Sequence, residues 1–312
     1  MMTKIGILGS GHVGSTLAQQ IVTLGLASEL VLIDPKADKV AADVMDLQDM
    51  QANLASHTRV FAGGYADLKD ADIVVSAFGN IAEAWKTPTD RFAELPFTKK
   101  YVEESAPQLK ASGFHGVLVV ISNPCDVITS LFQRLTGFDR NRVLGTGTLL
   151  DSSRMKRATA AALDIDPRSV DGYSLGEHGN SQFVAWSTVR VLGRPIQELL
   201  AESKTQLDLD QIDHDAKMGG HTVFFGKRYT NFGIAAAASR LLKAIIEDAH
   251  EELPVSNYYA PLDCYLGYPA IIGKQGIVKQ LALALTDEEK EKLQRSANFI
   301  KDKTAQVLGS TR

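Results

Sequence analysis

The stretch KIGILGSGHVGSTLAQQIVTLGL, residues 4–26, joins a short apolar run to an amphipathic segment through a glycine pattern. Its first five residues predict a buried strand, and its second half predicts a helix. Between them, Gly9, Gly11 and Gly14 follow the spacing G-x-G-x-x-G. The first glycine allows a tight turn, the second lets a ligand approach the backbone, and the third lets the helix pack closely on the strand. The stretch therefore predicts the first unit of a dinucleotide-binding fold.

An acidic residue strengthens this interpretation, because Asp34 directly follows a second apolar run that ends at Ile33. At that place a carboxylate accepts hydrogen bonds from an adenosine ribose and repels a 2′-phosphate. The N-terminus of the predicted helix, with His12 and Val13, offers backbone N–H groups to a pyrophosphate. We therefore expect the three glycines, His12, Val13 and Asp34 to bind NAD in preference to NADP. The alternative is a glycine turn with no ligand.

Outward from this unit, apolar β-branched runs alternate with amphipathic segments, which is typical of right-handed βαβ units and a parallel sheet. The expected strands are Lys4–Leu8, Glu29–Ile33, Arg59–Ala62, Asp72–Ala77, Val117–Ile121 and Arg142–Leu144. The expected helices are His12–Leu24, Lys36–Met50, Phe92–Ser112 and Val127–Leu135. We expect an α/β fold in which residues 1–145 form a Rossmann domain with a doubly wound parallel sheet.

The regular alternation of expected strands and helices ends after about residue 145. Residues 146–312 are expected to form an α+β catalytic domain that packs tightly on the Rossmann domain. The expected elements are a helix at Leu149–Leu163, a hairpin of Ser169–Leu175 with Phe183–Leu192, and helices at Leu209–Met218 and Gly233–Asp248. A last helix opens with a capping-box pattern at Thr286 and Glu289.

Composition excludes several classes of protein. The 312 residues are 45% hydrophobic and 22% charged, and 33 basic against 37 acidic residues give a net charge of −4. The chain has no strongly basic stretch, which argues against nucleic acid as a partner, and no apolar run long enough to span a bilayer. Cys125 and Cys264 form no spaced framework, which favours a reducing compartment and no metal site. We expect a cytoplasmic protein without a membrane segment.

Three further segments carry residues suited to acid–base chemistry. Asp151 and Arg154 lie one helical turn apart and share a face. His178 stands between two glycines at the end of a predicted strand, and Arg91 lies in a long loop after another strand. Asn123 follows the fifth strand in the sequence SNP.

Together with the glycine pattern, these segments resemble the L-lactate/malate dehydrogenase family over essentially the whole chain and in the right order. Within that family the likeness is strongest to the L-2-hydroxyisocaproate dehydrogenases. It rests on GNI at 79–81, PTDRFAE at 88–94, GTGTLLD at 145–151 and GEHGNSQFVAW at 176–186.

The resemblance implies a hydride transfer between NAD(H) and a 2-keto or 2-hydroxy acid, and physical chemistry suits the residues to it. Histidine side chains titrate near neutrality, so His178 would move the proton, while Asp151 would fix its tautomer and favour its charged form. Arg154 would hold the substrate carboxylate through two parallel hydrogen bonds. Arg91 would polarise the carbonyl from a loop that closes.

Two more residues complete the expected site. Asn123 would bind near the nicotinamide and the substrate oxygen, and Thr230 matches a family position that lines the substrate pocket. Each of these residues also has a plain structural interpretation: His178 as a core histidine, Arg154 and Arg91 as solvated cations, and Thr230 as packing. The side chains of His12, His57, His115, His214, His221 and His250 show no pairing pattern, so each is interpreted as surface or core. Trp85 is either a lid aromatic or an exposed side chain.

The loop after Gly79 departs from both better-known relatives. Malate-specific members carry an arginine there and lactate-specific members a glutamine, whereas this chain offers Ile81, Ala82 or Glu83. Lys86 is the one nearby cation. The loop therefore disfavours a dicarboxylate and leaves room for a larger apolar side chain.

These observations predict an NAD-dependent L-2-hydroxyacid dehydrogenase for substrates with a medium-size apolar side chain. An L-lactate dehydrogenase is the alternative within the class, and a non-catalytic NAD(H)-binding redox sensor is the alternative from another class. The sensor needs no proton relay, so the set Asp151, His178 and Arg154 argues against it. The resemblance further implies a homo-oligomer, either a dimer or a tetramer.

Overall fold

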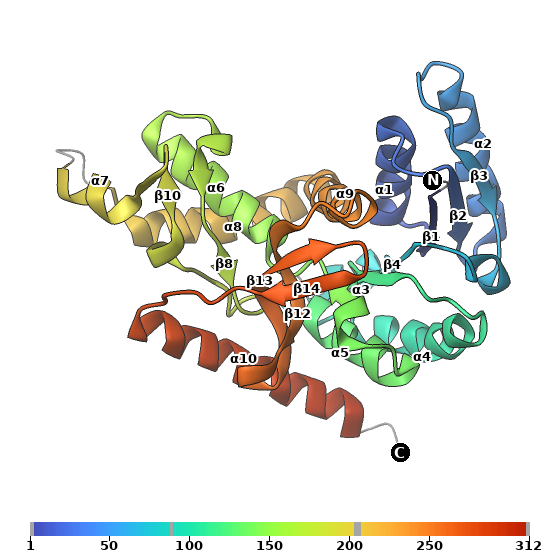
Figure 1. The fold of residues 1–312 in the computed structure, drawn as a ribbon. Helices are drawn as coiled ribbons and strands as arrows, with labels where there is room; N and C mark the ends of the chain where they lie inside the picture. Colours follow the sequence, from blue (N-terminus) through green and yellow to red (C-terminus); the bar gives the residue numbers. More distant parts are fainter. Residues whose placement is uncertain (1–2, 88–89, 91, 203–206, 310–312) are drawn as a thin grey trace.

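A computed structural model describes residues 3–87, 90, 92–202 and 207–309. Its main feature is a nine-stranded sheet in the order β14-β13-β12-β6-β5-β4-β1-β2-β3, which runs through the middle of the molecule (Figure 1). The parallel strands are β1 (Lys4–Leu8), β2 (Glu29–Ile33), β3 (Arg59–Ala62), β4 (Ile73–Ser76), β5 (Val117–Val120) and β6 (Val143–Gly145). All six expected strands are present within two residues of their expected bounds.

The parallel strands follow the order 3-2-1-4-5-6 of a doubly wound sheet, which confirms the expected α/β Rossmann fold. The chain changes direction between β1 and β4, and ligands bind at such a switch point beyond the carboxyl ends of the strands. The helices that connect these strands are α1 (His12–Leu24), α2 (Ala37–Gln51), α3 (Ile81–Lys86), α4 (Leu95–Ala111) and α5 (Cys125–Thr136).

The second half adds helices and short strands around the sheet. The helices are α6 (Leu149–Leu163), α7 (Ile196–Glu202), α8 (Leu209–Lys227), α9 (Phe232–Ile246) and α10 (Asp287–Gly309). The short strands are β7 (Val170–Asp171), β8 (Ser174–Leu175), β9 (Phe183–Val184), β10 (Arg190–Val191) and β11 (Arg194–Pro195). At the start of α10, Thr286 and Glu289 exchange hydrogen bonds of 2.9 and 3.2 Å, which confirms the predicted capping box.

Three strands were not expected from the sequence: β12 (Glu251–Tyr259), β13 (Cys264–Gly273) and β14 (Gly276–Gln280). They form an antiparallel meander, and β12 joins the parallel sheet through the pairing of Ser256 with Gly145. The second half therefore extends the sheet of the first.

The expected hairpin of residues 169–192 is instead divided between two small sheets. The strand β7 pairs with β10, whereas β8 pairs with β9. Gly172, at φ +125°, separates β7 from β8, and its missing Cβ would lie 2.8 Å from Val189. A close approach that only glycine permits thus bends the chain from one sheet to the other.

Two helix predictions also need correction. The helix expected to end at Met218 continues through Gly219 and Gly220 to Lys227, because these glycines pack against the guanidinium groups of Arg157 and Arg154. The expected loop after Gly79 contains the short helix α3, which Asn80 caps by accepting a hydrogen bond of 3.2 Å from the Ala82 amide.

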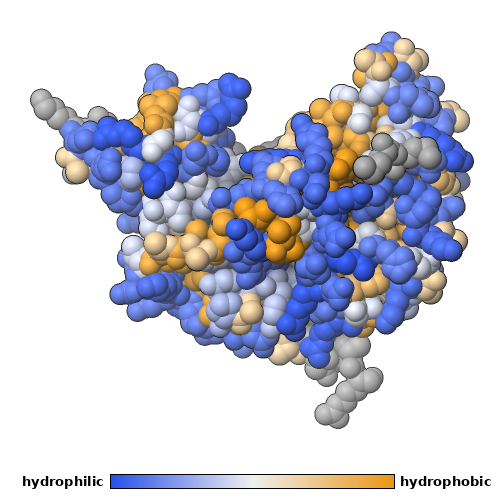
Figure 2. All heavy atoms as spheres, viewed as in Figure 1, coloured by the Kyte–Doolittle hydropathy of each residue, from blue (hydrophilic) through white to orange (hydrophobic). Residues whose placement is uncertain are grey.

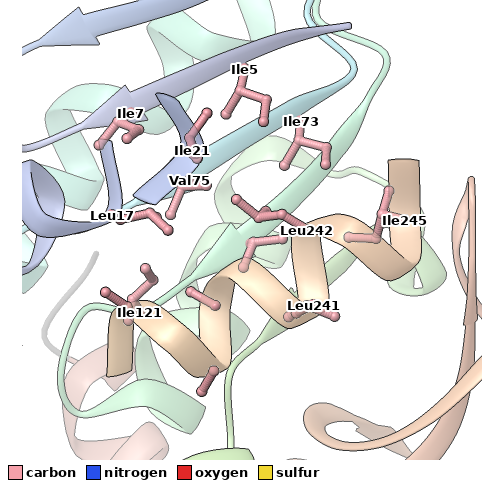
Figure 3. Packing of buried hydrophobic residues seen from close by; sticks show 14 of the residues in the cluster. Ile5, Ile7, Leu17, Ile21, Ile73, Val75, Ile121, Leu241, Leu242 and Ile245 are labelled. Atoms are coloured by element: carbon pink, nitrogen blue, oxygen red, sulfur yellow. The ribbon is translucent and has the colours of Figure 1, made fainter. Parts of the chain in front are cut away.

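The two halves share a core. Helices α1, α2 and α9 cover one face of the sheet, and α4, α5 and α10 cover the other. Figure 3 shows Leu242 and Ile245 of α9 beside the fully buried side chains of β1 and β4, such as Ile73. This shared core fixes the second half against the carboxyl edge of the parallel strands.

The surface in the view of Figure 2 is mostly hydrophilic, with separate apolar patches, one of them over β13 and β14, where Val278 is about half exposed. None of the helices in the described part of the chain is long and apolar enough to cross a membrane.

Candidate active site at the carboxyl edge of the sheet

A cavity of about 540 Å³ lies beyond the carboxyl ends of β1, β2, β4 and β5. Its walls include Gly9 after β1, Asp34 after β2, Ala77 after β4 and Ile121 after β5. The opposite wall comes from α6, α8 and the turn before α9, so both halves of the chain build it. This is the position at which a doubly wound fold binds a dinucleotide.

The glycine turn has the geometry that a pyrophosphate requires. Gly9 has φ +100°, which other residues rarely adopt, and a Cβ on Gly14 would lie 1.9 Å from the Gly9 carbonyl oxygen. A Cβ on Gly11 would meet nothing within 4 Å, so this glycine leaves space for a ligand against the backbone. The helix α1 begins directly after Gly11, with Val13 on the cavity wall.

The side chain of His12 links this turn to the second half of the chain. Its ring stacks flat on Tyr229, with centroids 3.7 Å apart and the planes at 1°. The sequence placed His12 in the cofactor site by position and interpreted its side chain as surface or core. In the structure the ring lines the cavity and joins α1 to the turn before Thr230.

Asp34 is half-buried and fixed by two backbone amides. Its carboxylate accepts hydrogen bonds from the amides of Ser10, at 2.8 Å, and Lys36, at 2.9 Å. Each oxygen keeps a lone pair for a ligand. The cavity wall also holds Lys39, but its ammonium pairs with Asp43 at 2.5 Å. Lys36 lies on the same wall. The carboxylate of Asp34 suits a ribose with free hydroxyls better than one that carries a phosphate.

The three residues expected to carry acid–base chemistry meet at the cavity. Asp151 Oδ2 lies 2.5 Å from His178 Nδ1, and Asp151 Oδ1 accepts a hydrogen bond of 3.0 Å from Arg154 Nη1. The side chains of Asp151, His178 and Arg154 are 1%, 10% and 14% exposed. One buried carboxylate therefore holds both the imidazole and the guanidinium, and both residues line the cavity.

Local structure explains why these groups meet. Asp151 lies in the first turn of α6, and Arg154 follows one turn later on the same face. The His178 segment follows β8 and is anchored to β13 by paired backbone hydrogen bonds of 3.0 and 2.8 Å between Gly176 and Gly267. The amide of Glu177 donates a further hydrogen bond of 2.7 Å to Ser296 of α10.

A residue that the sequence analysis missed holds the histidine backbone. Asp126, in the first turn of α5, is buried and accepts hydrogen bonds from the His178 amide, at 2.8 Å, and from Ser256 Oγ, at 2.6 Å. Burial raises the pKa of its carboxyl to about 6, although both hydrogen bonds favour the charged form. An acidic residue within an otherwise apolar helix face was the available signal.

Of the remaining predicted site residues, some line the cavity and one lies outside the described part of the chain. Asn123, which precedes Pro124 through a cis peptide bond, lines the cavity, and so does Thr230. Arg91 lies outside the described residues. His221, interpreted from the sequence as surface or core, lies on the cavity wall in α8. Among the described residues no three His, Cys, Asp or Glu side chains group as ligands for a metal ion.

The helix α3 lies against α8 through Trp85, which is partly buried rather than exposed. The indole stacks on Phe224, with centroids 4.6 Å apart, and its Nε1 donates a hydrogen bond of 2.9 Å to the Arg228 carbonyl. Ile81 and Ala84 of α3 line the cavity. Trp85 thus holds α3, which supplies part of the cavity wall, against α8.

Comparison with known proteins agrees with the fold. The family model for the lactate/malate dehydrogenase NAD binding domain matches residues 3–145 of the sequence. The family model for the lactate/malate dehydrogenase alpha/beta C-terminal domain matches residues 148–310. L-lactate dehydrogenase 3 of Bacillus cereus is 39% identical over 306 residues, 96% of each chain. L-lactate dehydrogenase 1 of Bifidobacterium longum is 40% identical over the same share.

Solved structures give the same picture. The minor L-lactate dehydrogenase from Enterococcus mundtii in its ligands-bound form has a TM-score of 0.92 at 33% identity, over 100% of this chain and 99% of that one. The lactate dehydrogenase from Cryptosporidium parvum, complexed with lactic acid and nicotinamide adenine dinucleotide, has a TM-score of 0.93 at 26% identity, over 98% of each chain.

A Rossmann sheet with an NAD-binding domain and a second α/β domain defines an NAD-dependent dehydrogenase of L-2-hydroxy acids. The chain belongs to the lactate/malate dehydrogenase family.

Proposed function

We propose that the chain uses NADH to reduce 2-keto acids whose side chain is apolar and larger than the methyl group of pyruvate, such as 2-ketoisocaproate. One observation supports the side-chain preference. Ile81 and Ala84 of α3 line the cavity. The place at which malate-specific and lactate-specific relatives carry an arginine or a glutamine is expected at Ile81, Ala82 or Glu83 of the same helix. Lys86 pairs with Glu83 at 2.8 Å and is not among the residues that line the cavity.

The roles of the polar residues follow from their places. Arg154 binds the substrate carboxylate and so fixes the orientation of C2. His178, whose Nδ1 is held by Asp151, directs Nε2 towards the carbonyl oxygen and gives it a proton, and in the reverse direction it removes the hydroxyl proton. The negative charge of Asp151 stabilises the imidazolium.

The bound dinucleotide supplies or accepts the hydride. The turn from Gly9 to Gly14 and the carboxylate of Asp34 would hold it, and Asn123 would orient the groups at the reacting end. Trp85 and the apolar residues of α3 exclude water, which strengthens the electrostatic interactions inside the site. Arg91, outside the described residues, stays our prediction for the group that polarises the carbonyl.

The strongest alternative is an L-lactate dehydrogenase, and the named relatives support it better than the larger-substrate proposal, because those cited above are all lactate dehydrogenases. The non-catalytic sensor has less support, since the buried pair of Asp151 and His178 has no purpose in a protein that only binds NAD(H).

We further propose a homo-oligomer, dimer or tetramer, in the cytoplasm. Exposed apolar side chains, Met218, Val223 and Phe232 among them, line a hollow between α6, α8 and α9 that a second copy would cover. The two cysteines are free and buried, which suits a reducing compartment. Light scattering at several concentrations measures the assembly.

The test of the proposed function is a steady-state panel of 2-keto acids with NADH. Each added methylene is worth ~0.8 kcal/mol in an apolar pocket, so the three extra carbons of 2-ketoisocaproate should give roughly 2 kcal/mol, about 30-fold in kcat/KM over pyruvate. A panel in which pyruvate leads by about tenfold or more would favour the lactate dehydrogenase. One in which oxaloacetate leads would show that Lys86 turns into the site.

A further inference from the structure

The backbone at His178 is held by three separate elements of the fold. The amide of Gly176 donates a hydrogen bond of 3.0 Å to a carbonyl of β13. The next amide, that of Glu177, donates one of 2.7 Å to Ser296 Oγ of α10. The third, that of His178 itself, donates one of 2.8 Å to Asp126 of α5. Both side-chain acceptors are buried. Three consecutive amides therefore fix this backbone to parts of the chain that are far apart in sequence.

A closed ring of hydrogen bonds joins Ser296 to the chain on both sides of His178. Ser181 donates to Glu177 Oε2 from its amide, at 2.9 Å, and from its hydroxyl, at 2.6 Å. A carboxylate only accepts, so the Ser181 hydroxyl proton lies in this bond, and the 2.9 Å contact between the two serine hydroxyls has Ser296 as its donor. The serine–glutamate ring thus consists of Glu177, Ser181 and Ser296, and removing either hydroxyl opens it.

The glycines on either side of the histidine make room for this ring. A Cβ on Gly176 would lie 2.6 Å from Ser296 Oγ. A Cβ on Gly179 would lie 2.1 Å from Glu177 Oε1. Both contacts are far closer than a real Cβ permits, so the spacing of glycines around His178 suits the serine hydroxyl and the carboxylate.

The members of the ring face the fold rather than a ligand. Glu177 is 3% exposed, and Ser296 is fully buried. In the described part of the chain, the cavity wall includes neither of them, nor any residue of α10. A buried carboxylate is unfavourable unless it is hydrogen-bonded, and the hydrogen bonds of Glu177 to Ser181 close the ring. Any influence of α10 on the chemistry must therefore pass through the backbone of His178.

We propose that Ser296 is a positioning residue, which acts through Glu177 and Ser181 to hold His178 where it exchanges a proton with the substrate. The proposal rests on the proposed function and adds α10 to the parts of the fold that the reaction requires. Asp151 holds the imidazole at Nδ1, whereas the serine–glutamate ring holds the backbone from which the imidazole extends. The two supports together define the place of the side chain.

The test is the rate of hydride transfer in a single turnover, followed as the loss of NADH absorbance. The enzyme–NADH complex is mixed with saturating 2-ketoisocaproate or pyruvate. Ser296→Ala and Ser181→Ala each open the ring and should lower this rate by roughly 10- to 100-fold, because a displacement of about 1 Å at a reacting group costs up to about 100-fold. The Kd of NADH should stay unchanged. Ser181→Thr restores a hydroxyl at a half-buried position and should recover most of the lost rate.

Ser187→Ala is the matched control, because it removes a different hydrogen bond between α10 and the same segment. The Ser187 hydroxyl donates to Glu289 Oε2 at 2.5 Å. Melting temperatures should fall in both Ser187→Ala and Ser296→Ala, whereas the single-turnover rate should fall only in Ser296→Ala. A wild-type rate in Ser296→Ala would overturn the proposal, and so would an equal fall in Ser187→Ala, since docking of α10 as a whole would then explain it. Ser181→Ala takes the place of Ser296→Ala if the latter fails to fold.

The pH profile of the single-turnover rate distinguishes positioning from a change of charge. The serine variants keep the carboxylates of Asp151 and Glu177, so the profile should lose height and keep its midpoint. A shifted midpoint at the wild-type height would overturn the positioning role.

A spectroscopic measurement separates this proposal from the proposed function. In protein labelled with ¹³C-histidine, the Cε1–H signal of His178 is identified by its loss in His178→Asn. This signal should shift in Ser296→Ala and stay in place in Ser187→Ala. An unmoved signal in Ser296→Ala would overturn the positioning role whatever the turnover. Failure of the wild type to reduce any 2-keto acid would overturn the proposed function, and a wild type that prefers pyruvate would overturn only its side-chain preference.

Discussion

Replacing Asp151 with asparagine tests the charge that the buried carboxylate supplies. Asp151 is 1% exposed, lies 2.5 Å from His178 Nδ1, and also binds Arg154. Its amide would be nearly isosteric and would still accept a hydrogen bond, but it has no negative charge to stabilise an imidazolium. Solvent screens this pair little, because both partners are buried.

The size of the effect follows from the lost charge-assisted hydrogen bond, which contributes ~1.5–3 kcal/mol. At 1.36 kcal/mol per pH unit this corresponds to about one to two units. Reduction requires protonated His178, so its kcat/KM falls as pH rises, and in Asp151→Asn the fall should begin about one to two pH units lower. Near neutral pH the loss should be about 10- to 100-fold.

The assay is the pH profile of kcat/KM for reduction of one 2-keto acid, followed by the loss of NADH absorbance. Asp166→Asn is the matched control, since this carboxylate lies at the surface and pairs with Arg168. An Asp151→Asn profile that coincides with that of the wild type, with kcat/KM within about twofold, would refute the role given to the carboxylate.

Three further changes have defined outcomes. Arg154→Lys keeps the charge but loses the planar pair of donors, so the Kd of oxamate should rise about 10- to 100-fold while NADH binding holds; the reverse pattern would place Arg154 in the cofactor site. Asp34→Asn removes the charge that repels a 2′-phosphate and should narrow the NADH over NADPH preference about tenfold in kcat/KM, whereas an unchanged ratio would reject the assignment. Asp126→Asn should remove a pH dependence of stability: because burial raises the folded-state pKa to about 6, this carboxyl stabilises the fold most below its ordinary pKa of ~3.9, and that stability is lost as pH rises to about 6. Urea unfolding should show that the free energy of unfolding of the wild type falls between pH 4 and pH 7 by roughly 2–3 kcal/mol more than that of Asp126→Asn. An equal fall in both proteins would contradict the raised pKa of Asp126.

The Rossmann half could be predicted because its signals are local. Strands such as β4 and β5 are buried on both faces and therefore appear as continuous apolar runs. The backbone of the turn requires glycine at Gly9 and Gly14, through contacts with residues close by in the sequence. The glycine spacing alone therefore predicts the turn.

The strands β12 to β14 could not be predicted, for a physical reason. Pro254 and Pro269 face each other within the β12–β13 ladder, and Gly267 lies in the same strand as Pro269. Such residues are poor strand formers and suggest loops. They are tolerated because β13 is buried between α9 and α10 and paired along its length, a tertiary effect that no local pattern reports.

The candidate site also combines features that local sequence predicts with features that depend on tertiary structure. Asp151 and Arg154 could be placed on one helix face from their spacing, but their meeting with His178 depends on β8 and β13, and only the family resemblance predicted it. Asp126 gave only a local signal, an acidic residue on an otherwise apolar helix face, because its contacts with the His178 backbone come from a distant part of the chain. The place of His221 on the cavity wall had no signal in the sequence.

In the proposed function, His178, held by Asp151, supplies the proton to a bound 2-keto acid. The most direct measurement is proton uptake when oxamate binds to the enzyme–NADH complex, followed with a pH indicator in weak buffer. Uptake should approach one proton per site in the wild type at mildly alkaline pH and should be absent in His178→Asn. Equal uptake in both proteins, or none in the wild type while oxamate binds, would contradict it.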